Sequence, residues 1–274
     1  MMAGGLIDTH CHLDAPEFEA DRDAVRQLAR QQGVAYCVIP AVEPAHWDGV
    51  AALAKQHQDV YALGVHPLYV TRAQEPDASR LGDRLNEALN DPALVALGEI
   101  GLDGFEGHPD MDMQLWWFRR QLALARDLGL PVILHVRRAV DWVLRELRRC
   151  PVVGGIAHAF NGSLQQAEAF MGMNFALGFG GALTFERSLQ LRRLATQLPM
   201  SALVLETDAP DIPPQWIYKT AQQRGQGQCQ GRNSPAELPR IARHLADLRD
   251  LSTAELTQAC SANARRVLRW PAGV

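Results

Sequence analysis

Short apolar runs rich in β-branched residues alternate along this chain with longer amphipathic segments, and the alternation repeats eight times. Such a pattern predicts βαβ units and therefore a parallel sheet. Eight repeats within about 250 residues favour an α/β fold of the closed (β/α)8 TIM-barrel type over an open, doubly wound sheet. The predicted strands are Gly5–Thr9, Ala35–Pro40, Val60–Val65, Leu94–Glu99, Val132–His135, Val152–His158, Phe175–Phe179 and Leu203–Glu206.

Helical spacing of apolar residues predicts the segments between these strands. Gly33 should end the first helix, because glycine commonly stops helices. After the eighth strand, a long polar connection over residues 209–233 is expected to carry function or to be mobile. Ser234 and Ser252 should then cap two further helices, the second running to about Leu268. The predicted helices between strands are Pro16–Gln32, His46–Gln58, Ala78–Asn90, Asp112–Leu128, Ala139–Arg149, Leu164–Met171 and Arg187–Leu198.

Composition limits what the chain can do. We find no internal linker, so residues 1–274 are expected to form one domain. The net charge of −4 argues against nonspecific binding of polyanions, and any nucleic-acid contact should be local, in a cleft. Five scattered cysteines without a Cys-x-x-Cys pair indicate reduced thiols and a cytoplasmic protein. We expect a monomer, with no signal peptide and no membrane span.

Acidic residues and histidines gather where the predicted strands end. In a (β/α)8 barrel, the active site lies at the carboxyl ends of the strands. His10 and His12 are two residues apart at the end of the first strand, so their side chains should share one face. Neutral imidazole is the commonest metal ligand near pH 7. The six candidate ligands at strand ends are His10, His12, Glu99, His135, His158 and Asp208.

This ligand set predicts a metal centre with two ions. Burying several ionisable groups at one barrel mouth costs several kcal/mol for each uncompensated charge, and metal coordination is the usual compensation. Four imidazoles and two carboxylates exceed the need of one ion. Glu99 lies between the other ligands around the barrel and is the natural bridge. One ion would take His10, His12 and Asp208, and the other His135 and His158.

Other polar residues have candidate roles with open alternatives. His66 is either a substrate contact or a structural hydrogen-bond partner. Arg137 is either a phosphate contact or half of a surface salt bridge. Glu206 is a candidate partner behind the metal ligands. Asp208 is also a candidate general base for an attacking water, because a metal pair activates such a water for hydrolysis. Cys11 should face away from its histidine neighbours and pack.

Several further side chains are expected to lie outside the site. Trp116, Trp117 and Phe118 should pack between barrel and helix. Trp216 and Tyr218, in the long connection, are better candidates for base stacking. The remaining histidines, predicted to face solvent, are His46, His57, His108 and His244.

Six motifs recur at the predicted strand ends, and they are Asp8–Asp14, Gly64–Pro67, Gly98–Asp103, Leu130–Arg137, His158–Ser163 and Glu206–Pro210. Taken together, they resemble the TatD family of metal-dependent hydrolases. The segment Glu206–Pro214, with the Gln-rich connection after it, resembles the YjjV-like branch of that family. The resemblance implies a TIM barrel of the metallo-dependent hydrolase superfamily, divalent metal dependence, and deoxyribonuclease activity, often 3′-to-5′ on single strands. By position, the family's metal ligands fall on the six candidates named above, with Glu99 and Asp208 in catalytic roles.

Two positions depart from the family pattern. Asn161 stands where a serine is usual, and Gly104 stands where an aromatic residue often follows the Gly-Leu-Asp motif. The YjjV-like branch is also less firmly tied to DNA than TatD itself. These departures leave the ligand set intact and leave the substrate open.

The leading hypothesis is a deoxyribonuclease or phosphodiesterase with two divalent ions, acting on DNA, single-stranded or at its ends, or on small phosphodiesters. Zinc, magnesium and manganese all suit the ligands. One alternative is an amidohydrolase-like enzyme that cleaves a carboxylic ester or cyclic amide, including an aminoacyl ester on tRNA. A carboxylated lysine often bridges the metals in such enzymes, and Glu99 at that place weakens this alternative. A noncatalytic barrel that binds a partner is the third hypothesis.

Overall fold

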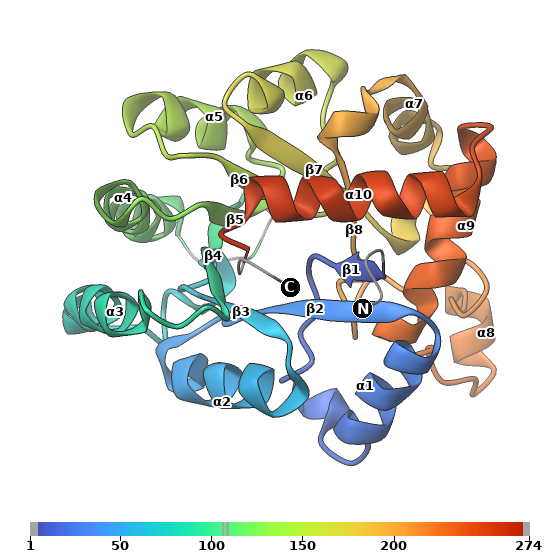
Figure 1. Ribbon diagram of the computed structural model, residues 1–274, viewed down its shortest axis with the longest axis horizontal. Helices are drawn as coiled ribbons and strands as arrows, with labels where there is room; N and C mark the ends of the chain where they lie inside the picture. Colours follow the sequence, from blue (N-terminus) through green and yellow to red (C-terminus); the bar gives the residue numbers. More distant parts are fainter. Residues whose placement is uncertain (1–4, 106, 108–109, 271–274) are drawn as a thin grey trace.

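The computed structural model describes residues 5–105, 107 and 110–270, and its strands form one parallel sheet in the order β1 to β8 (Figure 1). The eightfold alternation of the sequence is thus realised as a (β/α)8 barrel, and the predicted fold class is confirmed. The strands are β1 (Leu6–Asp8), β2 (Val34–Pro40), β3 (Val60–Leu63), β4 (Leu94–Asp103), β5 (Val132–Arg137), β6 (Gly155–Ala157), β7 (Phe175–Phe179) and β8 (Leu203–Leu205).

Backbone hydrogen bonds between the first and last strands close the barrel. The amide of Thr9 donates to the carbonyl of Leu205 at 3.0 Å. Just beyond the strand ends, the amide of Asp208 donates to the carbonyl of His10 at 2.9 Å. The two predicted ligands His10 and Asp208 are therefore held side by side by the closure itself.

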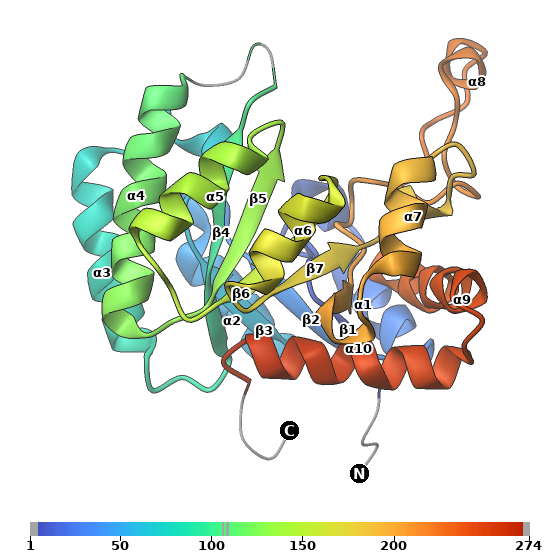
Figure 2. The same cartoon turned by 90° about the horizontal axis from the view of Figure 1, so that it is seen from above.

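Helices surround the sheet and cover its outer face (Figures 1 and 2). α10 runs across the end of the barrel where the strands begin, and α8 stands apart from the barrel at the other end (Figure 2). Among the described residues, no helix is both long and apolar enough to cross a membrane. The helices are α1 (Arg22–Gln31), α2 (Trp47–His57), α3 (Glu75–Ala88), α4 (Met111–Leu128), α5 (Val140–Arg149), α6 (Leu164–Met171), α7 (Leu189–Gln197), α8 (Ala221–Gly225), α9 (Leu238–Leu248) and α10 (Thr253–Val267).

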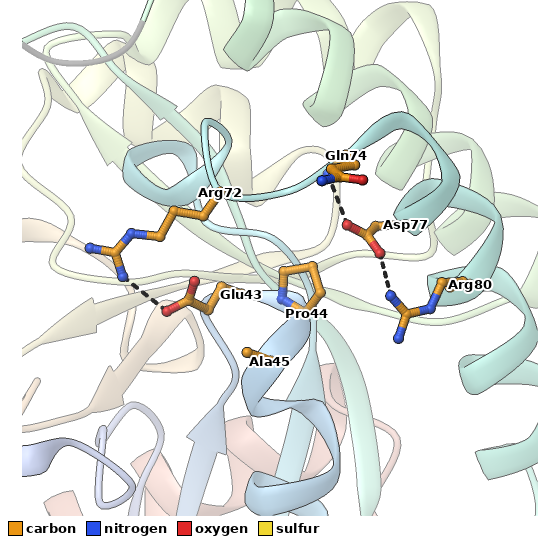
Figure 3. Close-up of a pocket in the computed structure, with 7 residues that line it drawn as sticks. All are labelled: Glu43, Pro44, Ala45, Arg72, Gln74, Asp77 and Arg80. Atoms are coloured by element: carbon orange, nitrogen blue, oxygen red, sulfur yellow. Dashed lines mark hydrogen bonds and ion pairs between the residues drawn. The ribbon is translucent and has the colours of Figure 1, made fainter.

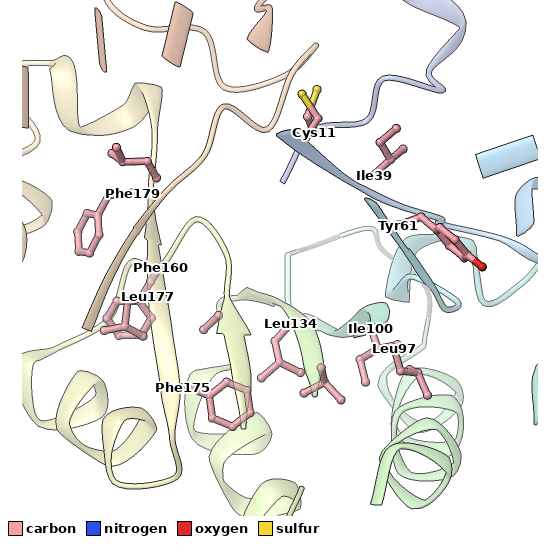
Figure 4. Close-up of a cluster of buried hydrophobic side chains, with 14 of the residues drawn as sticks. Cys11, Ile39, Tyr61, Leu97, Ile100, Leu134, Phe160, Phe175, Leu177 and Phe179 are labelled. Carbon is pink, nitrogen blue, oxygen red and sulfur yellow. The ribbon is translucent and has the colours of Figure 1, made fainter. Parts of the chain in front are cut away.

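Apolar side chains form two layers, one on each face of the sheet. Large residues such as Leu134, Phe160 and Phe175 fill the space between sheet and helices (Figure 4). Smaller residues fill the barrel interior, where Ala62, Ala96 and Ala176 pack with valines and isoleucines and with the end of α10. Because α10 and this apolar filling occupy the end where the strands begin, the barrel opens at the opposite, carboxyl end.

Several predicted boundaries shift. The helix predicted over Pro16–Gln32 is broken into a short 3-10 turn, Pro16–Phe18, and α1. Arg22 donates from Nε to the carbonyl of Leu13 at 2.8 Å, which ties the start of α1 back to the strand end. β6 begins at Gly155, three residues later than predicted. Gly155 has a φ of 150°, and a Cβ there would lie 1.9 Å from the carbonyl oxygen of Val132, so the close approach of β6 to β5 requires glycine.

Other boundaries match the predicted signals. α1 ends at Gln31, and Gly33 follows with a φ of 98°. Ser252 caps α10 by accepting from the Glu255 amide at 3.2 Å, while the Glu255 carboxylate accepts from the Ser252 amide at 3.1 Å. The connection over residues 209–233 contains the short helix α8, which was not predicted.

Candidate metal centre

The carboxyl ends of the strands surround a cavity of about 990 Å³. Five of the six predicted ligands line it, and His10 lies beneath them, fully buried. β4 is four residues longer than predicted and ends at Asp103 rather than Glu99. Glu99 consequently lies within the strand, deep in the cavity, and reaches the middle of the cluster. The lining ligands are His12, Glu99, His135, His158 and Asp208.

One group of ligand atoms gathers around Oε2 of Glu99. Nε2 of His10 lies 3.1 Å from this oxygen, and Nε2 of His12 lies 3.4 Å from it. The two imidazole nitrogens are 3.1 Å apart. Oδ1 of Asp208 is 3.5 and 3.6 Å from the two nitrogens. Ligands around a tetrahedral ion with bonds of about 2.0–2.2 Å stand about 3.3–3.6 Å apart. His10, His12 and Glu99 thus form one group that could hold a divalent ion, and Asp208 lies beside its two imidazoles.

A second group gathers around Oε1 of Glu99. Nε2 of His158 lies 2.8 Å from this oxygen, and Nδ1 of His135 lies 3.0 Å from it. The two nitrogens are 3.3 Å apart. Glu99 thus turns one oxygen to each group, which is the geometry that a bridging carboxylate needs.

Burial and charge at Glu99 fit cations in both places. Its side chain is 1% exposed, and Oε2 has no hydrogen-bond partner among the described residues although two imidazole nitrogens face it. Burial opposes ionisation of Glu99, but the surrounding imidazoles hold its pKa well below the usual range. The carboxylate is therefore ionised in a site with little water, and a positive charge must balance it.

Without a metal ion, protons on the histidines supply that positive charge. Burial opposes the protonation of His158, yet the neighbouring carboxylates, Glu99 foremost, raise its pKa to about 10. Burial likewise opposes protonation of His12, and its hydrogen bond and charge interaction with Glu99 raise the pKa to about 9. A site that draws protons onto imidazoles in this way is suited to exchange them for metal ions.

Asp8 supports the first group from below. Its Oδ1 accepts from the amides of Thr207 at 2.9 Å and His10 at 3.3 Å, and its Oδ2 accepts from the Thr207 hydroxyl at 2.6 Å. Complete burial raises the pKa of Asp8 to about 7. These bonds join the end of β1 to the segment after β8, so they hold His10 and Asp208 in place.

Asp103 supports the second group, and sequence analysis assigned it no role. Its Oδ2 accepts from Nε2 of His135 at 3.0 Å, while Nδ1 of the same ring faces Glu99. A carboxylate behind a ligating histidine fixes the ring and raises its basicity. The alternation of β4 contained the signal, because Asp103 lies four residues after Glu99 and shares its face.

His66 lies beside Glu99 but differs from the other histidines. Its Nδ1 accepts from the Leu68 amide at 3.1 Å, and its Nε2 lies 3.3 Å from Oε1 of Glu99. Burial lowers the pKa of His66 to about 4, so the ring is neutral with its proton on Nε2. That nitrogen is a hydrogen-bond donor and not a metal ligand. Both ring nitrogens thus have protein partners, as the structural alternative expects, and the substrate-contact role stays a prediction.

Arg137 lies at the rim of the cavity with 51% of its side chain exposed. Its Nη1 is 3.9 Å from Oδ2 of Asp103, beyond hydrogen-bond distance, and its guanidinium covers the Phe105 ring at 4.2 Å. A salt bridge this long and exposed contributes little to stability. The guanidinium therefore keeps donors available for an anion.

Glu206 lies behind His158. Its Oε1 is 3.9 Å from Nδ1 of His158 and accepts a hydrogen bond from the Ala159 amide. Burial raises the pKa of Glu206 to about 8. The residue thus occupies the place expected of a partner behind the ligands.

One histidine predicted to face solvent also lines the cavity. The side chain of His46 is 42% exposed, and its Nδ1 lies 3.6 Å from Oδ2 of Asp14. It reaches the cavity because it lies shortly after the carboxyl end of β2. His57 and His244 are partly buried and contact Asp23 and Arg192, while His108 lies outside the described residues.

The remaining aromatic and cysteine predictions have mixed outcomes. Trp117 and Phe118 are buried in the layer between sheet and helices, and Cys11 is fully buried there too, as predicted. Trp216 is not a free stacking surface. Its indole donates to Glu237 at 2.6 Å, and the Arg240 guanidinium covers its ring at 4.1 Å.

A second, smaller hollow of about 330 Å³ lies between the loops after β2 and β3 (Figure 3). Its charged groups pair with one another: Arg72 with Glu43 at 3.0 Å and Arg80 with Asp77 at 2.6 Å. The charges cancel, and no histidine or cysteine lines the hollow. It therefore lacks the chemistry of the larger cavity.

Comparisons with known proteins agree with this geometry. The model of a family described as TatD related DNase matches residues 7–269. The chain is 38% identical over 269 residues to the "Uncharacterized metal-dependent hydrolase YjjV" of Escherichia coli, covering 97% of this chain and 98% of that protein. It is 33% identical to the "3'-5' ssDNA/RNA exonuclease TatD" of Erwinia tasmaniensis, covering 96% and 99%.

Solved structures of related proteins have the same fold. The crystal structure of YjjV, a TatD homologue from Escherichia coli, superposes with a TM-score of 0.89 at 36% identity, covering 98% of this chain and 100% of that one. A hydrolase of the TatD family from Entamoeba histolytica superposes with a TM-score of 0.82 at 22% identity, covering 97% and 99%, which is a likeness of fold.

Proposed function

Since this chain belongs to the family of TatD-related DNases and is accordingly a metal-dependent hydrolase, we propose that it hydrolyses phosphodiester bonds, acting as a deoxyribonuclease at the ends of single-stranded DNA. We propose 3′-to-5′ cleavage, an activity named for related proteins at 32–33% identity. The nearest of the relatives described above is uncharacterised, so the substrate is our proposal.

The observation that carries the proposal is the pair of ligand groups on the two oxygens of Glu99. We assign His10, His12 and Asp208 to one ion, His135 and His158 to the other, and Glu99 to both. The separations of 2.8–3.6 Å within the groups support this assignment. Two divalent ions so held would lower the pKa of a water molecule and would neutralise charge on the phosphoryl group under attack.

The side chains around these ligands supply the remaining functions. Asp208 is 13% exposed at the mouth, and burial raises its pKa, so its carboxylate is placed to accept the proton of an attacking water. His66, whose Nε2 lies 3.3 Å from Oε1 of Glu99, lines the same cavity and is the proposed substrate contact beside the ions. Arg137 at the rim binds a neighbouring phosphate, because a guanidinium offers paired donors to such groups.

Metal-dependent hydrolysis of end-labelled single-stranded DNA tests the proposal. Wild-type protein loaded with Mn²⁺, Mg²⁺ or Zn²⁺ should produce a ladder from the 3′ end, and Asp208→Asn should abolish it. Bis-p-nitrophenyl phosphate serves as a minimal phosphodiester in the same series.

A parallel screen of carboxylic esters and cyclic amides covers the amidohydrolase alternative. Hydrolysis of these substrates without any cleavage of either phosphodiester would overturn the proposal. A chelator control separates metal-dependent activity from contamination by other nucleases.

A further inference from the structure

The arginines that line the cavity lie together at the end of β5. Among its lining residues in the described part of the chain, Arg137 and Arg138 are the only arginines or lysines. Both follow β5. Asp14 and Glu17 follow β1, on the opposite side of an eight-stranded ring, and Asp211 follows the neighbouring β8. The mouth is therefore acidic on one side and basic on the other.

The two arginines share one aromatic support. The guanidinium carbon of Arg137 lies 4.2 Å from the centre of the Phe105 ring, and that of Arg138 lies 4.6 Å from it. A guanidinium over a ring is attracted by the ring quadrupole, and the contact limits its motion. We call Phe105, Arg137 and Arg138 the rim clamp.

The backbone holds the rim clamp in place. The Gly104 amide donates to the carbonyl of Arg137 at 2.7 Å, and a Cβ on Gly104 would lie 2.7 Å from the carbonyl oxygen of Arg138. An aromatic residue, frequent at this position in the family, would not fit. The aromatic side chain of this chain instead lies one residue later, at Phe105, under both guanidinium groups.

The donors of the rim clamp are not consumed within the described part of the chain. There, the only carboxylate within 4.0 Å of either guanidinium is that of Asp103, at 3.9 Å, and that carboxylate accepts from His135. Both arginine side chains are exposed. Paired, exposed and oriented guanidinium groups match the geometry of phosphate oxygens.

We infer that the rim clamp binds the phosphates of nucleotides adjoining the cleaved bond, so that the substrate strand leaves the metal centre over β5. This inference rests on the proposed function for its substrate class. Asp103 lies between the metal centre and the rim clamp, because the same carboxylate faces both His135 and Arg137. The acidic side of the mouth would repel a strand that left in the other direction.

Binding without turnover provides the test. Fluorescence anisotropy of a labelled oligothymidylate is measured on the full chain with Ca²⁺ in place of the activating ion, over a range of salt concentrations. Arg138→Gln removes one guanidinium. Arg148→Gln is the matched control, because Arg148 is an exposed arginine in the last turn of α5, away from the mouth.

Arg138→Gln should raise the Kd about tenfold, the loss expected for one charged phosphate contact. The slope of log Kd against log salt should fall by about 0.7, corresponding to one phosphate of a single strand. Phe105→Leu should raise the Kd less, and Phe105→Tyr should restore wild-type binding, since tyrosine keeps the ring. Arg148→Gln should bind as wild type does.

An unchanged Kd and salt slope in Arg138→Gln would overturn the inference, whether or not the wild type cleaves DNA. An equal loss in Arg148→Gln would also overturn it, because the effect would then come from overall charge. Binding that depends on Arg138 in a protein that hydrolyses no phosphodiester would instead refute the proposed function, and only the phosphate binding of the rim clamp would stand.

Discussion

Glu99 is the residue on which the site depends, because each of its carboxylate oxygens faces a different set of imidazole nitrogens. Its burial makes the arrangement specific: a carboxylate that is 1% exposed cannot be balanced by bulk water. Asp8 and Asp103 hold the two sets of imidazoles in place through hydrogen bonds of 2.6–3.3 Å. Two predictions belong to this scale.

Glu99→Gln keeps the shape of the side chain and removes the charge that both ion positions share. We expect bound metal to fall below two ions per chain and kcat to fall by more than about 100-fold, a larger loss than for residues behind the ligands. Metal content by atomic emission and steady-state hydrolysis measure the two effects. Glu87→Gln, exposed on α3, is the control. Full metal content in Glu99→Gln would contradict the bridging role.

Asp103→Asn tests the carboxylate behind His135. The amide cannot match a carboxylate as an acceptor for the His135 ring, so we expect metal affinity to fall about 10–100-fold. Isothermal titration with Mn²⁺ measures the affinity, and the exposed Asp83→Asn is the control. Equal affinities in the two variants would exclude a role for Asp103 in positioning the ligand.

At the scale of elements, the strands beneath the site are also held by a buried ion pair that joins a helix to the sheet. Arg26 on α1 binds Asp59, which precedes β3, through two bonds of 2.6 Å. Arg26 also donates to the carbonyl of Val34, and Asp59 accepts from the amide of Cys37, so both reach β2. One ion pair therefore connects three elements beneath the first ligand group.

Asp59→Ala should lower the free energy of unfolding by about 3–5 kcal/mol, because it leaves the Arg26 charge buried without a partner. Urea denaturation monitored by circular dichroism measures the change. The double variant Arg26→Met/Asp59→Ala should lose less than Asp59→Ala alone, since no charge is then stranded. A loss below about 1 kcal/mol in Asp59→Ala would show that water reaches the pair.

At the scale of the whole molecule, the barrel separates stability from chemistry. Apolar residues and α10 fill the end where the strands begin, and the ligands gather at the opposite end. Only the folded chain brings these ligands together, so metal binding and folding are coupled.

Metal ions should therefore stabilise the folded chain. At a free metal concentration of 100 times Kd, binding adds about 2.7 kcal/mol to the free energy of unfolding. Differential scanning calorimetry should then show a Tm about 5–10 °C above that in excess chelator. Glu99→Gln should lose most of this increase. A Tm unaffected by metal in the wild type would contradict the proposed ligand set.

The sequence by itself determined the barrel and brought the six candidate ligands to notice. Parallel strands that alternate with helices all end at the same edge, so residues at strand ends meet whatever path the loops take. That is why His10 and Asp208, 198 positions apart, could be grouped from local patterns. The one-domain organisation, the monomeric state and the cytoplasmic location stay predictions.

Only the tertiary structure decided which further side chains reach that edge. Asp103 contacts His135 because β4 extends four residues beyond its predicted end, and His46 lines the cavity from the loop that follows β2. The Phe105 ring meets two arginines through a close backbone approach at Gly104. The length of a strand beyond the apolar core and the path of a loop both depend on contacts between residues that are distant in sequence. Local periodicity does not predict those contacts.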